Sequence, residues 1–292
     1  MLTGLDGARC LQVLHGTRTW YHADWQQALA ELRLGDMANW RVPVDVPSVS
    51  HSKHVIACYR ITLADGRVIY YKRYDYRGRW KEVLRFWLRP SKPAVEKWGY
   101  RRYRACGVAV PLTVAYGESR FLGLLRAAFI ITEEVPDAVS LDDFVAAGLP
   151  GVAAEERVRK MGAFAGRLIG SISKAHAACV FHYDLKWRNI LVQQRNGEYY
   201  PVFIDCPRAF FSCLRRVYGV TADMSALARL AVSYLTLGQR YRFLAACLGQ
   251  PADAATRKAW YRRVQRRLGK RLPKMISLQE SPLQGVRFDG KY

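Results

Sequence analysis

Two short segments constrain the fold of this chain more than any other part of its sequence: HYDLKWRNIL, from His182 to Leu191, and VFIDCPRA, from Val202 to Ala209. In the first, an acidic residue is followed by a lysine two positions later and an amide five positions later. The second is an apolar strand that ends in another aspartate. A long helical pattern from about Ala153 to Ala178 precedes both. This order of helix, loop, hairpin and strand-end aspartate is typical of the C-terminal lobe of a kinase.

Each polar side chain in these segments suits one task of phosphoryl transfer. We expect Asp184 to orient the acceptor hydroxyl or take its proton, and Lys186 to neutralise charge on the migrating phosphoryl group. Asn189 and Asp205 offer the hard oxygen ligands that Mg²⁺ prefers. His182 is better placed to brace the loop than to react. The alternative is a chance spacing in a polar loop, and the surrounding order of elements argues against it.

The composition favours one bilobal domain or two closely packed lobes. The chain has 292 residues, half of them hydrophobic, so it can bury a sizeable core. Its formal net charge of +22 attracts phosphate-rich partners, which include nucleic acid, an anionic membrane and a phosphorylated substrate. The seven cysteines are scattered and form no CxxC pair. We therefore expect reduced thiols in a cytosolic compartment, and neither a disulfide framework nor a zinc site.

Any membrane contact is expected to be peripheral. The N-terminus does not have the pattern of a secretory signal, and no apolar run reaches the roughly 18 residues that suggest a membrane span. The segment from Arg77 to Lys92 places apolar residues at helical spacing and cations at the other positions. Its apolar stripe comprises Trp80, Val83, Leu84, Trp87 and Leu88. Such a helix either lies at an anionic lipid interface or packs its stripe on the sheet and leaves the cations in water.

The first third of the chain predicts a short extension and a small sheet. Residues 1–50 show no sustained period apart from a helical candidate over residues 23–34, and we expect them to pack on the first lobe. From His54 to Tyr74, two strand-like runs flank an Asp65-Gly66 turn, which is a strong hairpin signal. Lys72 in the second run lies either at the edge of a sheet or over a nucleotide as a phosphate-binding lysine.

A carboxylate is needed to position such a lysine, and Glu96 is the available candidate. It lies in the next predicted helix, where Pro93 suits the first turn and Gly107 the end. The alternative is a surface glutamate that balances its arginine neighbours.

The following strands lead to a predicted hinge. Backbone groups around Glu134 and Val135 are candidates for binding adenine, and a short helix capped near Ser140 comes next.

Further along, Asp223 either caps the helix that carries Leu227 or reaches back to the backbone of the catalytic loop.

With these positions assembled, the chain resembles the lipopolysaccharide core kinases of Gram-negative bacteria, the Kdo/heptose kinase family within the protein-kinase-like fold. The resemblance covers about residues 54–240. It rests on YYKRY with Lys72, Glu96 before the RACGV turn, FIITEEVPDAVSLDDF, HYDLKWRNILV, IDCPRA and the helix MSALARLAVSYL. The segment FIITEE…SLDDF and the IDxxRA end are closer to inner-core heptose kinases than to kinases in general.

This resemblance implies an α+β bilobal fold. The N-terminal extension and a small antiparallel N-lobe would occupy residues 1–135, and a mainly helical C-lobe residues 136–292. It implies ATP and Mg²⁺ as cofactors, and transfer of a phosphoryl group to a sugar hydroxyl of the lipopolysaccharide core, with a heptose as the expected sugar. The expected location is cytoplasmic, at the inner membrane, with the anionic membrane and the core acceptor as partners and no nucleic acid.

The resemblance also assigns roles to single residues. It implies that Lys72 binds phosphates, Glu96 holds Lys72, Asp184 is the catalytic base, Asn189 and Asp205 bind the metal, and Arg208 adds positive charge near the acceptor.

Two departures from the pattern of protein kinases bear on these expectations. Residues 46–55 carry serines and no glycine where a glycine-rich phosphate loop would lie, so Ser50 or Ser52 and local amides are the candidate substitutes. Cys206 and Pro207 stand where protein kinases have Phe-Gly, and no APE-type end follows, which counts against a regulated protein kinase.

Competing hypotheses are a protein or small-metabolite kinase, and a basic pseudokinase that binds membrane or nucleic acid. The presence of every catalytic residue type weighs against the pseudokinase.

Overall fold

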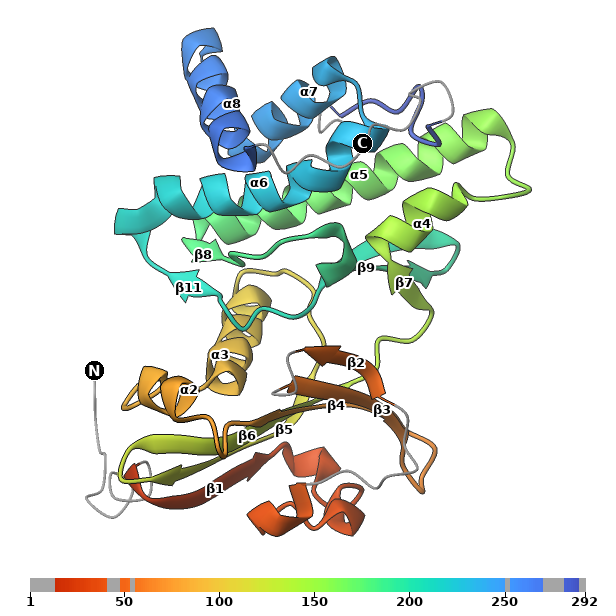
Figure 1. The fold of residues 1–292 in the computed structure, drawn as a ribbon. Coiled ribbons are helices and arrows are strands. Elements are labelled where there is room, and N and C mark those ends of the chain that lie inside the picture. Colours follow the sequence, from red (N-terminus) through yellow and green to blue (C-terminus); the bar gives the residue numbers. More distant parts are fainter. Residues whose placement is uncertain (1–13, 41–47, 53–55, 250–252, 270–280, 289–292) are drawn as a thin grey trace. The chain divides into compact units, whose positions relative to one another are not determined.

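The computed structural model describes residues 14–40, 48–52, 56–249, 253–269 and 281–288 (Figure 1). The chain divides into two compact units. The first contains residues 1–100 and 111–134, and the second contains residues 101–110 and 135–292. An antiparallel sheet forms the first unit and helices dominate the second, which confirms the expected α+β class.

The sheet of the first unit has six strands in the order β1-β5-β6-β4-β3-β2, and every neighbouring pair is antiparallel. The strands are β1 (Gly16–Tyr21), β2 (Ser48–Ser52), β3 (Ile56–Thr62), β4 (Val68–Asp75), β5 (Thr113–Phe121) and β6 (Leu124–Glu133). The predicted hairpin is confirmed as β3 and β4. Lys72 pairs with Cys58 on one side and Ile130 on the other. It therefore lies in an interior strand, and its alternative placement at a sheet edge is wrong.

The N-terminal residues pack on one face of this sheet, as expected. The indole N–H of buried Trp40 donates to the Leu34 carbonyl at 2.8 Å, and the Tyr71 hydroxyl of β4 donates to the Trp40 carbonyl at 2.9 Å.

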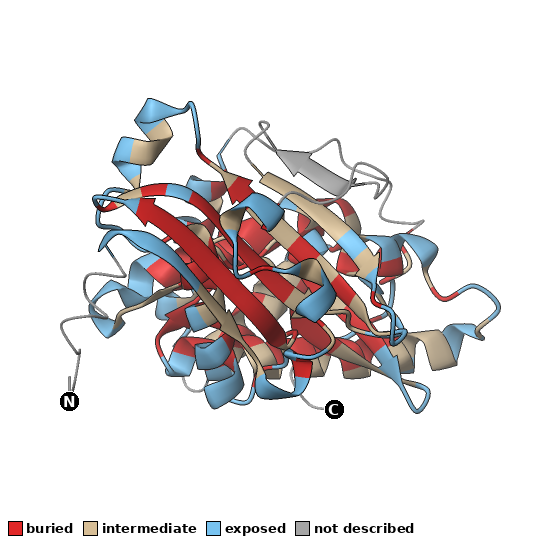
Figure 2. Ribbon diagram, turned by 90° about the horizontal axis from the view of Figure 1, so that it is seen from below, coloured by how far each residue is buried: buried red, intermediate tan, exposed pale blue. Residues whose placement is uncertain are grey.

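The prediction of a single helix over residues 23–34 is wrong, because the chain forms separate 3₁₀ turns there. These turns are η1 (Ala23–Trp25) and η2 (Ala30–Leu32), followed by η3 (Met37–Trp40). Strand β1 was not expected. It pairs with β5, which is buried along almost its whole length (Figure 2).

The segment from Arg77 to Lys92 is not one helix. Helix α2 (Trp80–Arg85) is short, and helix α3 (Lys92–Ala105) begins only after Pro90. Proline cannot continue a helix that precedes it, because its ring clashes with the preceding turn. The Ser91 hydroxyl accepts the N–H of Ala94 at 3.2 Å, and so caps α3.

The second unit is built around the long helix α5 (Ala154–Ala177), which the sequence predicted. The other helices are α4 (Leu141–Ala147), α6 (Arg216–Tyr234), α7 (Leu237–Leu248) and α8 (Ala254–Leu268). The short strands are β7 (Ala138–Ser140), β8 (Val180–Phe181), β9 (Ile190–Arg195), β10 (Glu198–Phe203) and β11 (Phe210–Phe211), and the 3₁₀ turns are η4 (Trp187–Asn189) and η5 (Cys213–Arg215). Ser140 caps α4 through the N–H of Asp143, as expected.

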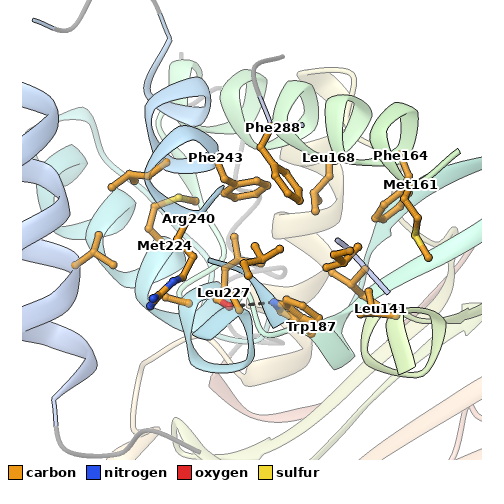
Figure 3. Close-up of a pocket in the computed structure, with 18 of the residues that line it drawn as sticks. Leu141, Met161, Phe164, Leu168, Trp187, Met224, Leu227, Arg240, Phe243 and Phe288 are labelled. Carbon is orange, nitrogen blue, oxygen red and sulfur yellow. Dashed lines mark hydrogen bonds between the residues drawn. The ribbon is translucent and has the colours of Figure 1, made fainter. Parts of the chain in front are cut away.

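An apolar cavity of about 90 Å³ lies among the helices of this unit (Figure 3). Met161 and Leu168 of α5, Met224 of α6 and Phe243 of α7 are among the side chains that line it. Arg240 also reaches its wall. The lining is otherwise almost entirely hydrocarbon, so this cavity suits an apolar occupant.

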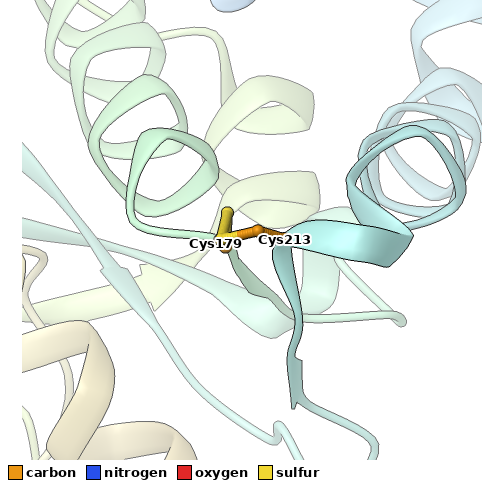
Figure 4. Close-up of a disulfide and its surroundings, with 2 residues drawn as sticks. All are labelled: Cys179 and Cys213. Carbon is orange, nitrogen blue, oxygen red and sulfur yellow. A yellow bond between two sulfur atoms is a disulfide. The ribbon is translucent and has the colours of Figure 1, made fainter.

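Cys179 and Cys213 form a disulfide, with their Cα atoms 5.1 Å apart (Figure 4). The expectation of reduced thiols is therefore wrong for this pair. The two residues are 34 positions apart, and the turn after α5 and the turn η5 bring them together, so spacing does not reveal the pair. Cys58, Cys106, Cys206 and Cys247 are thiols, and Cys10 lies outside the described residues.

Within the described residues, no helix has the length and the apolar character needed to cross a bilayer.

Candidate active site

The loop after α5 is anchored by one buried carboxylate. Asp223 accepts the backbone N–H of His182 at 3.1 Å and that of Tyr183 at 2.6 Å. Its Oδ2 also lies 3.1 Å from Nε2 of His176 on α5. Asp223 sits inside α6, which begins at Arg216, so it does not cap that helix. Of its two possible roles, contact with the backbone of the catalytic loop is the one that the structure shows.

His182 braces the loop against the strand that leads to Asp205. Its Nε2 lies 2.9 Å from the carbonyl oxygen of Ile204. Because a carbonyl oxygen can only accept, the proton of the ring is on Nε2. The ring is fully buried and packs against Tyr103 and Phe203. The residue therefore has a bracing position and no access to a substrate.

The structure brings three of the predicted residues together at the end of this loop. Lys186 Nζ lies 2.8 Å from Oδ1 of Asp184 and 3.0 Å from Oδ2. The side-chain amide of buried Asn189 donates to the backbone carbonyl of Asp184 at 2.8 Å. Both side chains of the ion pair keep about a quarter of their surface exposed, so a reactant can reach them.

Asp205 follows β10 and is tied to the same loop through its neighbour. The N–H of Ile204 donates to the carbonyl of Asn189 at 3.0 Å. Asp205 itself has φ +56°, and Tyr183 has φ +66°. Residues other than glycine adopt this left-handed region at a cost, and such strained positions cluster at active sites. Backbone strain thus occurs on both segments of the candidate site.

The donor set of Asn189 and Asp205 fits Mg²⁺. The hydrogen bond from Asn189 uses the donor side of its amide, which leaves the amide oxygen as a possible ligand. Asp205 adds a carboxylate. No group of three or more His, Cys, Asp or Glu side chains that would suit a metal occurs in the described part of the chain. A metal here would take its remaining ligands from phosphate oxygens and water, as Mg²⁺ usually does.

Arg208 is exposed and lies in a turn just after Asp205, closed by a hydrogen bond of 3.0 Å from the Ala209 N–H to the Cys206 carbonyl. The structure records no bond from Arg208 to Asp184 or Lys186 in the part of the chain that it describes.

In the first unit, Lys72 and Glu96 form an ion pair. Lys72 Nζ lies 3.4 Å from Oε2 of Glu96. Glu96 is 3% exposed, so it is not a surface residue. The Tyr100 hydroxyl donates to its other oxygen at 2.9 Å. Sequence reasoning missed Tyr100, although its position one helical turn after Glu96 was the available signal.

At the predicted hinge, part of the backbone already makes a hydrogen bond within the protein. The Glu134 N–H donates to the Val68 carbonyl at 2.9 Å, and the Glu134 carboxylate pairs with Arg60 at 2.7 Å. A nucleobase would therefore have to contact the Glu134 carbonyl or the backbone of Val135. The side chains of Ser50 and Ser52, the candidate substitutes for a glycine-rich loop, lie outside the described residues.

Comparison with known proteins agrees with this geometry. The profile of the Lipopolysaccharide kinase (Kdo/WaaP) family matches residues 62–247. The chain belongs to this family. Among solved structures, "WaaP in complex with acyl carrier protein" aligns with a TM-score of 0.59 at 20% identity, and the alignment covers 87% of this chain and 100% of that one. The shared fold confirms the expected architecture. Among curated proteins, no sequence matches this chain.

Membership of the Kdo/WaaP family confirms the resemblance drawn from the sequence. The protein is a kinase of lipopolysaccharide biosynthesis, a phosphotransferase that acts on a sugar hydroxyl and uses ATP as its phosphoryl donor.

Proposed function

We propose that this kinase phosphorylates a heptose hydroxyl of the lipopolysaccharide inner core at the cytoplasmic face of the inner membrane. The observation that carries the proposal is the loop held by Asp223, which sets Asp184, Lys186 and Asn189 within hydrogen-bonding reach of one another. The family match supports a sugar acceptor over a protein acceptor.

In this proposal, Asp184 orients the acceptor hydroxyl and receives its proton as the new O–P bond forms, while the bond between the γ-phosphorus of ATP and the bridging oxygen breaks and ADP leaves. Lys186 lies within 3.0 Å of that carboxylate and places positive charge next to the transferring phosphoryl group. Asn189 and Asp205 would hold Mg²⁺, which when bound neutralises charge on the phosphates.

The nucleotide contacts are assigned to the first unit and the hinge. Lys72, fixed by Glu96 and Tyr100, would bind phosphate oxygens. The backbone of Glu134 and Val135 would bind adenine. Arg208 would face the acceptor, which already carries negative charge and so suits a chain with a net charge of +22.

Replacement of Asp184 by Asn tests this assignment. The variant keeps a side chain of the same size but cannot take a proton, so kcat should fall by roughly a hundredfold to ten-thousandfold. The measurement is transfer of labelled phosphate from ATP to purified core lipopolysaccharide, with mass spectrometry to locate the modified sugar.

Glu155→Gln is the matched control, because Glu155 is an exposed carboxylate in the first turn of α5. It should retain full activity. Turnover of Asp184→Asn at the wild-type rate would remove Asp184 from its role, and label on a sugar other than heptose would overturn the substrate assignment.

We propose in addition that the protein binds an acyl carrier protein. The related structure is a complex of WaaP with acyl carrier protein, and two features here favour such a partner. The chain is strongly basic, and the apolar cavity between α5, α6 and α7, of about 90 Å³, offers a place for the end of an acyl chain (Figure 3).

Ala231→Leu is the test of this partner, because Ala231 lines the cavity and the larger side chain fills part of it. In binding assays with purified carrier protein, the wild type should bind the acylated form more tightly than the form without an acyl chain, and the variant should lose that preference while keeping its melting temperature. Equal binding of both forms by the wild type would contradict the cavity assignment, and no binding would remove the partner.

A further inference from the structure

Six large apolar side chains of the first unit are exposed on its surface. Each of them is between 49% and 67% exposed. We call them the tryptophan patch: Trp80, Leu84, Trp87 and Leu88 on and just after α2, and Phe121 and Leu122 at the tip of the β5–β6 hairpin. Single exposed apolar residues are ordinary, but a group of this size marks an interaction surface.

The two halves of the patch lie against each other. The indole N–H of Trp87 donates to the carbonyl of Leu122 at 3.3 Å, and the N–H of Leu88 donates to the carbonyl of Gly123 at 3.3 Å. A Cβ at Gly123 would come within 2.9 Å of the Leu88 side chain. The hairpin tip and the segment after α2 therefore form one continuous surface.

A buried arginine fixes the shape of this surface. The Arg120 guanidinium donates to the carbonyls of Phe86 at 3.2 Å, Arg89 at 2.7 Å and Gly123 at 2.9 Å. Its Nε also donates to the Glu118 carboxylate, with a distance of 2.9 Å between Nε and Oε1. Burial alone would raise the pKa of the Glu118 carboxyl, but hydrogen bonds from Arg120 and Tyr116 outweigh it and leave this pKa below its usual value. Glu118 is thus ionised at neutral pH.

The remaining apolar residues of the segment explain why the patch faces outward. Val83 and Phe86 pack inward against the cluster formed by Tyr74, Tyr76, Leu125 and Ala128. The stripe seen in the sequence is therefore divided: Val83 contacts the sheet, and the four other residues point to solvent. The simpler reading, in which the whole stripe packs on the sheet, is wrong.

The positive charge around the patch indicates that its partner is anionic. Between residues 77 and 92 there are six cations, Arg77, Arg79, Lys81, Arg85, Arg89 and Lys92, and one acid, Glu82. Arg77 and Arg126 also line an open groove beside Phe121. Tryptophan and leucine flanked by arginine and lysine suit the boundary of an anionic bilayer, where indoles enter the headgroup region and cations meet lipid phosphates.

We propose that the tryptophan patch is a docking surface for an anionic phospholipid bilayer. The inference deepens the proposed function and rests on it in one respect, since an acceptor of lipopolysaccharide biosynthesis is held in a membrane. Docking requires no phosphoryl transfer, so binding and activity can be measured separately.

The experiment is sedimentation of the full chain with vesicles of phosphatidylethanolamine and phosphatidylglycerol, which contain no lipopolysaccharide. The wild type should bind them, and should not bind vesicles of phosphatidylcholine. The double variant Trp80→Ala/Trp87→Ala should bind at least about tenfold more weakly because two indoles no longer enter the interface. The triple variant Arg79→Glu/Lys81→Glu/Arg85→Glu should bind about a hundredfold more weakly.

Trp98→Ala is the matched control, since Trp98 is a half-exposed tryptophan on α3 outside the patch. It should bind vesicles like the wild type. Both patch variants should keep the wild-type melting temperature, and full activity on an acceptor dissolved in detergent, which separates failure of docking from failure of catalysis. Wild-type vesicle binding by the tryptophan variant, or equal binding to phosphatidylcholine, would overturn the proposal.

Discussion

At the scale of single residues, Asp223 is the side chain that anchors the loop of the candidate site. It lies buried in α6 and accepts hydrogen bonds from two consecutive backbone amides of the loop that carries Asp184. A buried carboxylate that accepts several N–H groups is held firmly in one position, and it holds those groups in turn. We therefore expect it to act on catalysis through the loop, without touching a substrate.

Asp223→Asn should lower both stability and kcat. One oxygen becomes an NH₂ group that cannot accept a backbone N–H, so at least one buried amide loses its partner, at a cost of about 1–3 kcal/mol. The measurements are thermal unfolding and steady-state kinetics. Asp253→Asn is the control, because Asp253 makes comparable bonds to Thr256 at the exposed start of α8. A variant of Asp223 with wild-type kcat would show that the loop holds its shape without this carboxylate.

At the scale of elements, the disulfide joins the turn after α5 to η5, just before α6. It closes a loop between two residues that are 34 positions apart, and this loop contains Asp184, Asn189 and Asp205. A cross-link of this length stabilises a fold by about 3–4 kcal/mol, chiefly by restricting the unfolded chain.

Cys213→Ser should therefore lower the free energy of unfolding by about 3–4 kcal/mol. Dithiothreitol, which reduces the disulfide to two thiols, should have the same effect on the wild type and none on the variant. Denaturant unfolding with and without this reductant measures both. Cys58→Ser serves as control, because Cys58 is a thiol of the first unit. An unfolding curve of the wild type that does not change with reductant would contradict the role of the bond.

The elements that the sequence predicted well are those whose signal is local. Helix α5 has a long period of apolar residues, and the β3–β4 hairpin has a strong turn signal. The segment from Arg77 to Lys92 has an equally clear period but does not form one helix, because Pro90 and the bonds from Arg120 divide it. Strand β1 has a weak pattern, and pairing with β5 decides its structure.

At the scale of the whole molecule, the candidate site was predictable as far as it depends on short motifs. Asp184, Lys186 and Asn189 lie within six residues of one another, and the structure places them in contact as the motif predicts. Tyr100 had a local signal that was overlooked, because it lies one helical turn after Glu96. The contacts of Arg120 with Phe86 and Arg89 join segments that are distant in the sequence, so no spacing indicates them. The pairing of Cys179 with Cys213 was missed for the same reason.

The short connection between Asp205 and α6 has a consequence for how such an enzyme is governed. In protein kinases, a long stretch at this point becomes ordered when it is phosphorylated, and this turns the enzyme on. Here few residues are available, and one of them is covalently fastened to the base of the catalytic loop. We therefore expect the output of this kinase to follow the supply of acceptor and nucleotide.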